Sequence, residues 1–177
     1  RAPKRGKPQP QKENRIAYYP GCSLHSLSSE LDHSTKAVLA ELDVELYEPK
    51  GWTCCGSSPA HSTDHFLATT LPIKNLALIE QSGFSEAVAP CTACYARFKT
   101  AQYDISKDPE LKKAVDAKIG YAYQDRVKVK SLLDVFDERV GLDAIAKRVK
   151  KPLGDLKIVS YYGCLMTRPP KVTHADH

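Results

Sequence analysis

Thiol side chains at regular spacing are the residues of this sequence with the clearest chemistry. Cys22 stands alone, Cys54 and Cys55 are adjacent, and Cys91 and Cys94 form a C-x-x-C pair. Such a pair at the start of a helix suits a metal, because free N–H groups and the helix dipole favour ionised thiolates. The intervening stretches of 31 and 35 residues are each about one helix plus one strand long. The fold can therefore bring all five sulfurs to one place.

The number of these thiols indicates the kind of metal centre. Neighbouring side chains such as Cys54 and Cys55 point apart and rarely bind one small ion together, whereas a multi-iron cluster can use both. A tetrahedral zinc ion takes four thiolates and would leave one of the five spare. We therefore expect an iron–sulfur cluster, with structural zinc, disulfides and free core thiols as the alternatives.

The beginning of the chain lacks the pattern of a secretory signal. Residues 1–14 are rich in Pro, Gln, Lys and Arg, a composition typical of a disordered basic tail, and no apolar segment follows them. Nor does any stretch reach the roughly 18 apolar residues that span a bilayer. We expect a cytoplasmic protein without a membrane span, in whose reducing surroundings metal ligation is favoured over disulfides.

Charge and motif content argue against two other function classes. The chain has 26 Lys and Arg against 21 Asp and Glu, a formal charge of +5, and much of the excess lies in the first dozen residues and near the C-terminus. It has no arginine stripe and no interleaved aromatic platform, so nucleic acid is not an expected partner. It also lacks the G-x-G-x-x-G pattern of dinucleotide binding. A redox role would need electrons from partner proteins.

Strand and helix patterns alternate along the first part of the chain. Strands are predicted at 15–19, 44–47 and 86–89, and helices at 28–42, 64–81 and 93–103. This order predicts an α/β fold with a mainly parallel sheet and flanking helices, whose ligand site lies beyond the carboxyl ends of the strands. The five cysteines all fall at strand-to-helix junctions. The apolar faces of the first two helices are predicted from helical spacing as Leu31, Ala37, Val38 and Leu42, then Phe66, Leu67, Leu71, Leu76 and Ile79.

The C-terminal part of the chain repeats the beginning. Helical stretches at 109–118, 131–139 and 143–149 lead to a predicted strand at 156–162, which runs into Tyr-Tyr-Gly-Cys at 161–164. The first strand runs into Tyr-Tyr-Pro-Gly-Cys at 18–22. We interpret residues 15–155 as a first domain and residues 156–177 as the beginning of a truncated second repeat.

Three motifs in this order resemble the cysteine-rich, or CCG, domain family: Gly-Cys at 21–22, Cys-Cys-Gly at 54–56 and Pro-Cys-Thr-Ala-Cys at 90–94. Within the family the likeness is closest to the B subunit of heterodisulfide reductase, and it covers about residues 15–170. The resemblance implies a non-cubane [4Fe-4S] cluster bound by Cys22, Cys54, Cys55, Cys91 and Cys94. Cys164 would be the first ligand of a second cluster, although no Cys-Cys-Gly and no C-x-x-C follows it.

The resemblance also implies a function. The chain is expected to be the iron–sulfur subunit of a heterodisulfide reductase-like complex, an oxidoreductase that handles small disulfide or thiol substrates. Its implied electron-transfer partners are a ferredoxin-like C subunit and a flavin-bearing A subunit. The alternatives are a related subunit of a sulfur-oxidation or succinate/fumarate redox complex, and a non-catalytic zinc-stabilised module.

Other residues near the cysteine loops have less specific signals. His25 and His61 are candidates for an acid–base or ligand role, although a histidine beside a loop is more often simply hydrogen-bonded or exposed. Asn75 is a candidate for hydrogen bonds to the cysteine loops.

Overall fold

The computed structural model describes residues 14–57, 59–154, 156–161 and 163–174. The basic tail predicted at 1–14 lies outside these residues except for Asn14. No helix in the described part of the chain is long and apolar enough to cross a membrane.

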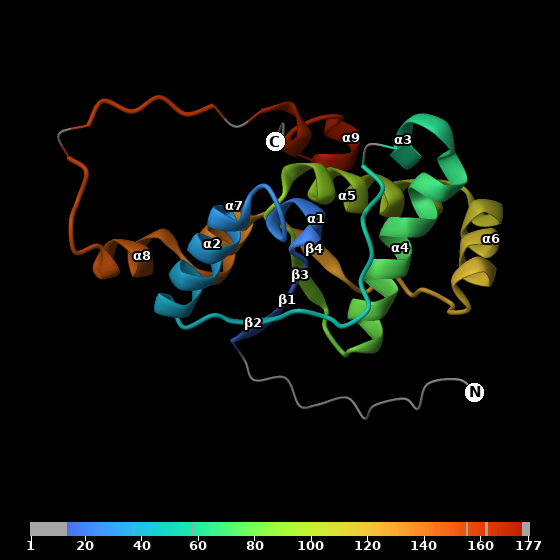
Figure 1. Cartoon of the computed structure of the whole chain (residues 1–177), viewed down its shortest axis with the longest axis horizontal. Helices are drawn as coiled ribbons and strands as arrows, with labels where there is room; N and C mark the ends of the chain where they lie inside the picture. Colours follow the sequence, from blue (N-terminus) through green and yellow to red (C-terminus); the bar gives the residue numbers. More distant parts are fainter. Residues whose placement is uncertain (1–13, 58, 155, 162, 175–177) are drawn as a thin grey trace.

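A sheet of four parallel strands organises the described residues (Figure 1). The strands are β1 (Arg15–Tyr18), β2 (Glu45–Tyr47), β3 (Glu86–Val88) and β4 (Lys128–Lys130), in the order β2-β1-β3-β4. Ala17 is in register with Tyr47 on one side and with Ala87 on the other. The predicted α/β class with a mainly parallel sheet is confirmed, and β4 is a strand that the sequence pattern did not predict.

Helices connect the strands and cover the sheet (Figure 1). The connections through α2, α4 and the pair α5–α6 follow the expected alternation of strand and helix. The helices are α1 (Gly21–Leu24), α2 (Ser29–Glu41), α3 (Pro59–Thr63), α4 (His65–Gln81), α5 (Thr92–Lys107), α6 (Pro109–Ile119), α7 (Leu132–Asp134) with a π-helix at Val135–Val140, α8 (Leu142–Arg148), a 3-10 turn at Cys164–Met166 and α9 (Pro170–Thr173).

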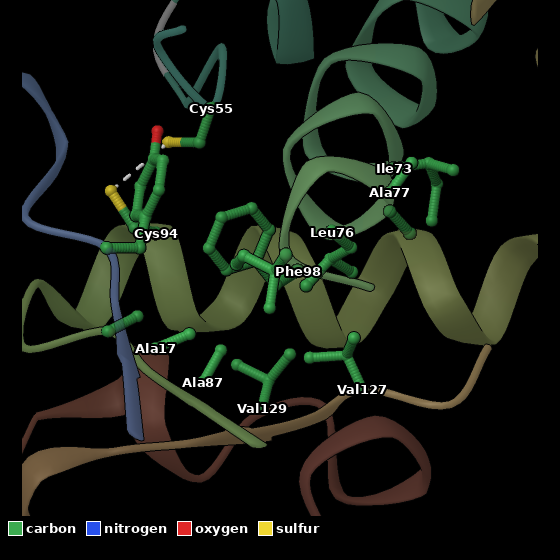
Figure 2. Close-up of a cluster of buried hydrophobic side chains, with 14 of the residues drawn as sticks. Ala17, Cys55, Ile73, Leu76, Ala77, Ala87, Cys94, Phe98, Val127 and Val129 are labelled. Carbon is green, nitrogen blue, oxygen red and sulfur yellow. Dashed lines mark hydrogen bonds between the residues drawn. The ribbon is translucent and has the colours of Figure 1, made fainter. Parts of the chain in front are cut away.

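Alternate residues of the strands build a separate core on each face of the sheet. Ala17 and Tyr19 face the larger core, in which Leu76 of α4 and Phe98 of α5 are fully buried (Figure 2). Ile16 and Tyr18 face the smaller core, which includes Leu39 of α2. Because side chains of a strand alternate between faces, a strand in the middle of this sheet needs apolar residues on both, which Ile16, Ala17 and Tyr18 supply.

The apolar face predicted for α2 is wrong. Leu31 and Val38 are each 42% exposed and Ala37 is exposed, whereas Asp32, Thr35 and Leu39 are buried. The physical reason is a pair of polar contacts that hold Asp32 inward. The Tyr18 hydroxyl donates to Asp32 Oδ1 at 2.5 Å, and Lys36 Nζ lies 2.6 Å from Asp32 Oδ2. A buried carboxylate with two partners is tolerated, and it rotates the helix away from the orientation that hydrophobicity alone predicts. Leu67 of α4, also predicted to be inward, is 41% exposed.

The strand predicted at 156–162 is also absent from the described part of this segment. Residues 156–161 have no strand pairing, and the side chains of Leu156, Ile158, Val159 and Tyr161 are exposed. A strand forms only where another strand accepts its backbone hydrogen bonds, so an apolar pattern predicts a capacity to pair and not the partner. The opposite error occurs at β4. Its Lys-Val-Lys sequence is too short and too charged to predict a strand, yet it pairs with β3.

Truncation of two adjacent α2 side chains tests the corrected orientation. Leu39→Ala removes a fully buried side chain and should lower the free energy of unfolding by about 2–5 kcal/mol. The matched control Val38→Ala removes an exposed one and should change it by no more than about 0.5 kcal/mol. Denaturant unfolding followed by circular dichroism measures both, and equal losses would contradict the orientation.

Candidate functional site

Three neighbouring strands deliver the five expected cysteines to one edge of the sheet. Cys22 follows β1 within α1, Cys54 and Cys55 lie in the loop after β2, and Cys91 and Cys94 open α5 after β3. Because β2, β1 and β3 are parallel neighbours, their carboxyl ends meet at the same edge. Residues far apart in the chain are therefore brought together by the strand order.

The sulfur atoms form a group that runs from the surface into the core. Cys22 Sγ lies 3.8 Å from Cys54 Sγ, and both residues are exposed. The Cys55 and Cys94 sulfurs are 3.3 Å apart, and both residues are buried (Figure 2). Cys91 is half-buried and is hydrogen-bonded to Cys94. The site thus has a wet side at Cys22 and Cys54 and a dry side at Cys55 and Cys94.

Glycine lets the backbone approach this group closely. Gly21 has a φ of +69°, and a Cβ at its position would lie 2.9 Å from Cys94 Sγ. Gly56 has a φ of +73°, and its N–H donates to Cys54 Sγ at 3.4 Å. Both positions need the left-handed conformation, which glycine adopts at little cost. The glycines of the Gly-Cys and Cys-Cys-Gly motifs therefore have a structural role beside the sulfurs.

Hydrogen bonds separate the pKa values of the three inner thiols. The bond with Cys94, helped by N–H groups at the start of α5 and by the Ser23 side chain, lowers the pKa of Cys91 to about 5. The bond with Cys94 likewise lowers the pKa of Cys55 to about 7. The hydrogen bonds that Cys94 shares with both neighbours, together with burial, raise its own pKa. At neutral pH the group therefore contains a ready thiolate, the form that binds metals.

At the exposed side, the pKa of a thiol is raised and not lowered. Burial, followed by the hydrogen bond with Cys54 and its charge, raises the pKa of Cys22.

A buried aromatic residue supports the group from beneath. The Tyr19 ring packs edge-on against Phe98 and Trp52, with ring centroids 4.7 Å and 5.3 Å apart. Its hydroxyl donates to the Thr53 carbonyl at 2.7 Å. The Asn75 side chain of α4 accepts a hydrogen bond from the Thr53 N–H and donates one to the Thr53 carbonyl, both at 2.8 Å. The expected hydrogen bonds from Asn75 to a cysteine loop are present. Tyr19 and Trp52 were missed, because an aromatic residue beside a motif is indistinguishable in sequence from ordinary core.

The sixth cysteine lies in a C-terminal turn, outside the loops that carry the other five. Cys164 is exposed and opens the 3-10 turn, which packs against α5. It follows Gly163, whose φ of +70° matches the +69° of Gly21 before Cys22. In the described part of the chain no hydrogen bond joins Cys164 to the other thiols. His61 is exposed on α3, and His25 lies beside the wet side.

The arrangement differs from a site for one ion. Among the described residues, no group of three or more Cys, His, Asp and Glu side chains has the geometry to hold a single metal ion. The sulfurs instead form one close pair, Cys22 and Cys54, and one hydrogen-bonded set of three, Cys55, Cys94 and Cys91. Five thiols at one edge, two glycines that admit them and at least one N–H group directed at sulfur are a donor set that fits a multi-iron cluster.

Comparison with known proteins connects this site to a family. Residues 16–99 match the model of the cysteine-rich domain, CCG. The resemblance inferred from the motifs is thereby confirmed. The matched CCG stretch begins in β1 and ends within α5, so it contains all five of the gathered cysteines.

Curated relatives extend the similarity over most of the chain. The chain is 33% identical over 160 residues to the 8-methylmenaquinol:fumarate reductase membrane anchor subunit of Wolinella succinogenes, which covers 90% of this chain and 55% of that protein. It is 25% identical over 161 residues to the B subunit of a Ferredoxin/F(420)H(2)-dependent CoB-CoM heterodisulfide reductase of Methanosarcina acetivorans, covering 89% and 53%. The chain thus spans about half the length of these relatives, both named as reductase subunits.

One solved structure shares the fold. A crystal structure of a hypothetical protein from Helicobacter pylori matches with a TM-score of 0.59 and 18% identity, over 71% of this chain and 26% of that chain. At this identity the match shows the fold alone.

Two glycine substitutions test the close approach at Cys94. Gly21→Ala and Gly120→Ala both place a side chain at a φ of +69°, which costs about 1–2 kcal/mol, but a Cβ at Gly120 meets open space. Gly21→Ala should therefore lower the melting temperature clearly more than its control, because it also displaces the Cys94 sulfur. Thermal unfolding measures both, and equal losses would show that the contact is unimportant.

Alkylation tests the pKa order of the thiols. Since the pKa of Cys91 is lowered to about 5 and that of Cys22 is raised, Cys91 is ionised above about pH 5, whereas Cys22 ionises only in alkaline solution. In reduced, iron-free chain, the iodoacetamide rate at Cys91 should level off above about pH 6. The rate at Cys22 should keep rising beyond about pH 9. Mass spectrometry of the peptides resolves the two sites, and parallel profiles would refute the order.

Proposed function

We propose that the CCG domain of this chain binds a non-cubane [4Fe-4S] cluster through Cys22, Cys54, Cys55, Cys91 and Cys94. We further propose that it acts as the iron–sulfur subunit of a heterodisulfide reductase-like complex. The observation that carries the proposal is the gathering of five thiols from three parallel strands at one sheet edge. Its finer parts, the cluster type and the sulfur substrate, draw on the CCG match and on the similarity to the B subunit of heterodisulfide reductase.

The donor set favours iron over zinc. Five cysteines exceed the four ligands of a tetrahedral zinc site, and Cys54 and Cys55 are adjacent, which suits a cluster with several irons. The lowered pKa values of Cys91 and Cys55 supply thiolates at neutral pH. The Gly56 N–H, directed at Cys54 Sγ, can tune a reduction potential, because hydrogen bonds to sulfur stabilise the more negative state.

The two sides of the site have different tasks. When bound, the cluster would pass to a disulfide the electrons that partner proteins supply. Tyr19 and Phe98 close the site from the core side and exclude water behind Cys55 and Cys94, which strengthens every charge interaction there. Cys22 and Cys54 leave the opposite side open to solvent. A small disulfide or thiol substrate would approach from that side.

Partners must complete the electron path. A ferredoxin-like C subunit and a flavin-bearing A subunit are the proposed electron carriers. Residues 156–177 are proposed to begin a second CCG repeat with Cys164 as its first ligand. The Tyr-Tyr-Gly-Cys sequence at 161–164, which repeats the Tyr-Tyr-Pro-Gly-Cys at 18–22, supports that assignment.

A second candidate is an equivalent subunit of a quinol:fumarate reductase complex. It is favoured by the 33% identity to the Wolinella succinogenes protein, which exceeds the 25% identity to the heterodisulfide reductase relative. The same cluster would then pass electrons between a quinol and a fumarate-reducing partner. A complex isolated through this chain that oxidises a menaquinol analogue but reduces no disulfide would decide for this candidate.

Metal analysis tests the cluster. Anaerobically purified chain should contain about four irons and four acid-labile sulfides with a redox-active EPR signal. Cys55→Ser and Cys91→Ser should each lower the iron content sharply, because each removes a proposed ligand. The control Cys164→Ser should retain it, because Cys164 lies outside the group of five. About one zinc per chain without sulfide would instead support the non-catalytic module.

A further inference from the structure

His25 is held at the wet side of the cysteine group by an acidic and an aromatic residue. It caps the C-terminus of α1, three residues after Cys22. Its Nε2 lies 3.4 Å from Glu48 Oε1, which also accepts the Trp52 indole N–H at 2.8 Å. The imidazole and indole rings meet edge-on, with centroids 5.1 Å apart. Two side chains from the loop after β2 thus fix the imidazole.

This arrangement connects the two loops that carry the exposed thiols. His25 belongs to the turn of Cys22, while Trp52 lies two residues before Cys54 and packs on Tyr19 beneath the sulfurs. The Cys22 and Cys54 sulfurs are 3.8 Å apart. The side chain of His25 nevertheless remains 45% exposed, so it can meet both a bound molecule and water.

Two carboxylates lie near His25. Glu48 faces Nε2 directly, and Asp32 of α2 lies within electrostatic range. Asp32 is itself engaged by Tyr18 and Lys36, which leaves Glu48 as the carboxylate that orients the ring. A carboxylate that holds one imidazole nitrogen fixes the orientation of the other, as in many acid–base sites. With Nε2 directed at Glu48, Nδ1 is the nitrogen assigned to a substrate.

We propose that His25 is the proton donor for disulfide cleavage at this site and that Glu48 is its positioning residue. The inference rests on the proposed disulfide-reducing function. The balanced step is R–S–S–R′ + 2 e⁻ + 2 H⁺ → R–SH + R′–SH. A low-potential iron–sulfur or flavin partner supplies both electrons, and the S–S bond breaks. His25 gives one proton to a departing sulfur, water gives the other, and His25 recovers its proton from water.

A proton donor has a physical purpose in this reaction. Two electrons entering an S–S bond leave two thiolates, and a proton neutralises the negative charge that would otherwise build up beside Cys22 and Cys54. An imidazole is well matched to this transfer because its ordinary pKa is near neutral, so it both gives and regains a proton at physiological pH. General acids of this kind contribute about 10²–10⁴-fold to rates.

Kinetics of the whole complex test the proposal. His25→Gln should lower the rate of 2-hydroxyethyl disulfide reduction by viologen at pH 7 by about 100-fold, and added imidazole should restore about tenfold or more. The matched control His33→Gln, on the exposed face of α2, should stay within about twofold of wild type. Glu48→Gln should change the pH profile of activity, because no carboxylate then orients the ring.

A second measurement needs no turnover. In the iron-loaded full chain, 2-hydroxyethyl disulfide should protect His25 but not His33 from diethyl pyrocarbonate, as measured by mass spectrometry. Protection of His25 alone places the disulfide beside it and supports the proposal. Equal modification with and without the disulfide overturns it.

The outcomes of these experiments distinguish a failure of the proton-donor proposal from a failure of the proposed disulfide-reducing function. An active wild type with His25→Gln within about threefold of its rate overturns the proton donor and leaves the function intact. Loss of both iron and activity in His25→Gln, without rescue by imidazole, assigns His25 a structural role and also overturns it. A wild-type complex that contains iron and sulfide but reduces no disulfide overturns the proposed function and this inference with it.

Discussion

Parallel pairing of β1 with both β2 and β3 is the constraint on which the cysteine group depends. Ala17 is in register with Tyr47 on one side and Ala87 on the other, so three strand ends and the loops that follow them share one edge. A different strand order would leave the same cysteines on separate surfaces. The three buried residues of β1, at 16–18, are therefore as necessary to the site as the thiols, because only a strand buried on both faces can occupy the centre.

The site has a tightly packed side toward the core and a solvent-exposed side opposite it. Tyr19 leaves β1 and touches Trp52 and Phe98, while Asn75 fixes the backbone before Cys54. These contacts hold two of the cysteine loops against the core. The exposed thiols and His25 lie on the opposite side, where the structure is open to solvent. Such a division would let one small domain hold the proposed cluster firmly and still expose it to a substrate.

The apolar segment at 156–161 has a strand-like sequence pattern but pairs with no strand in the described residues. Its residues repeat the character of β1, yet their side chains are exposed and unpaired with the sheet. The chain spans about half of its curated relatives. A strand pattern that finds no edge in the described residues is consistent with the proposed second repeat, whose remaining strands would supply its partners.

The sequence by itself determined the fold class, the alternation of strands and helices, and the five cysteines that the structure brings together, because these depend on local periodicity and on residue type. It could not determine the inward face of α2, where the buried hydrogen bonds of Asp32 outweigh hydrophobicity. It could not reveal β4 or exclude a strand at 156–161, because pairing depends on a distant partner. Nor could it show that Glu48 and Trp52 hold His25. Only the tertiary structure decided these features, because each arises from contacts between residues that the chain keeps far apart until it folds.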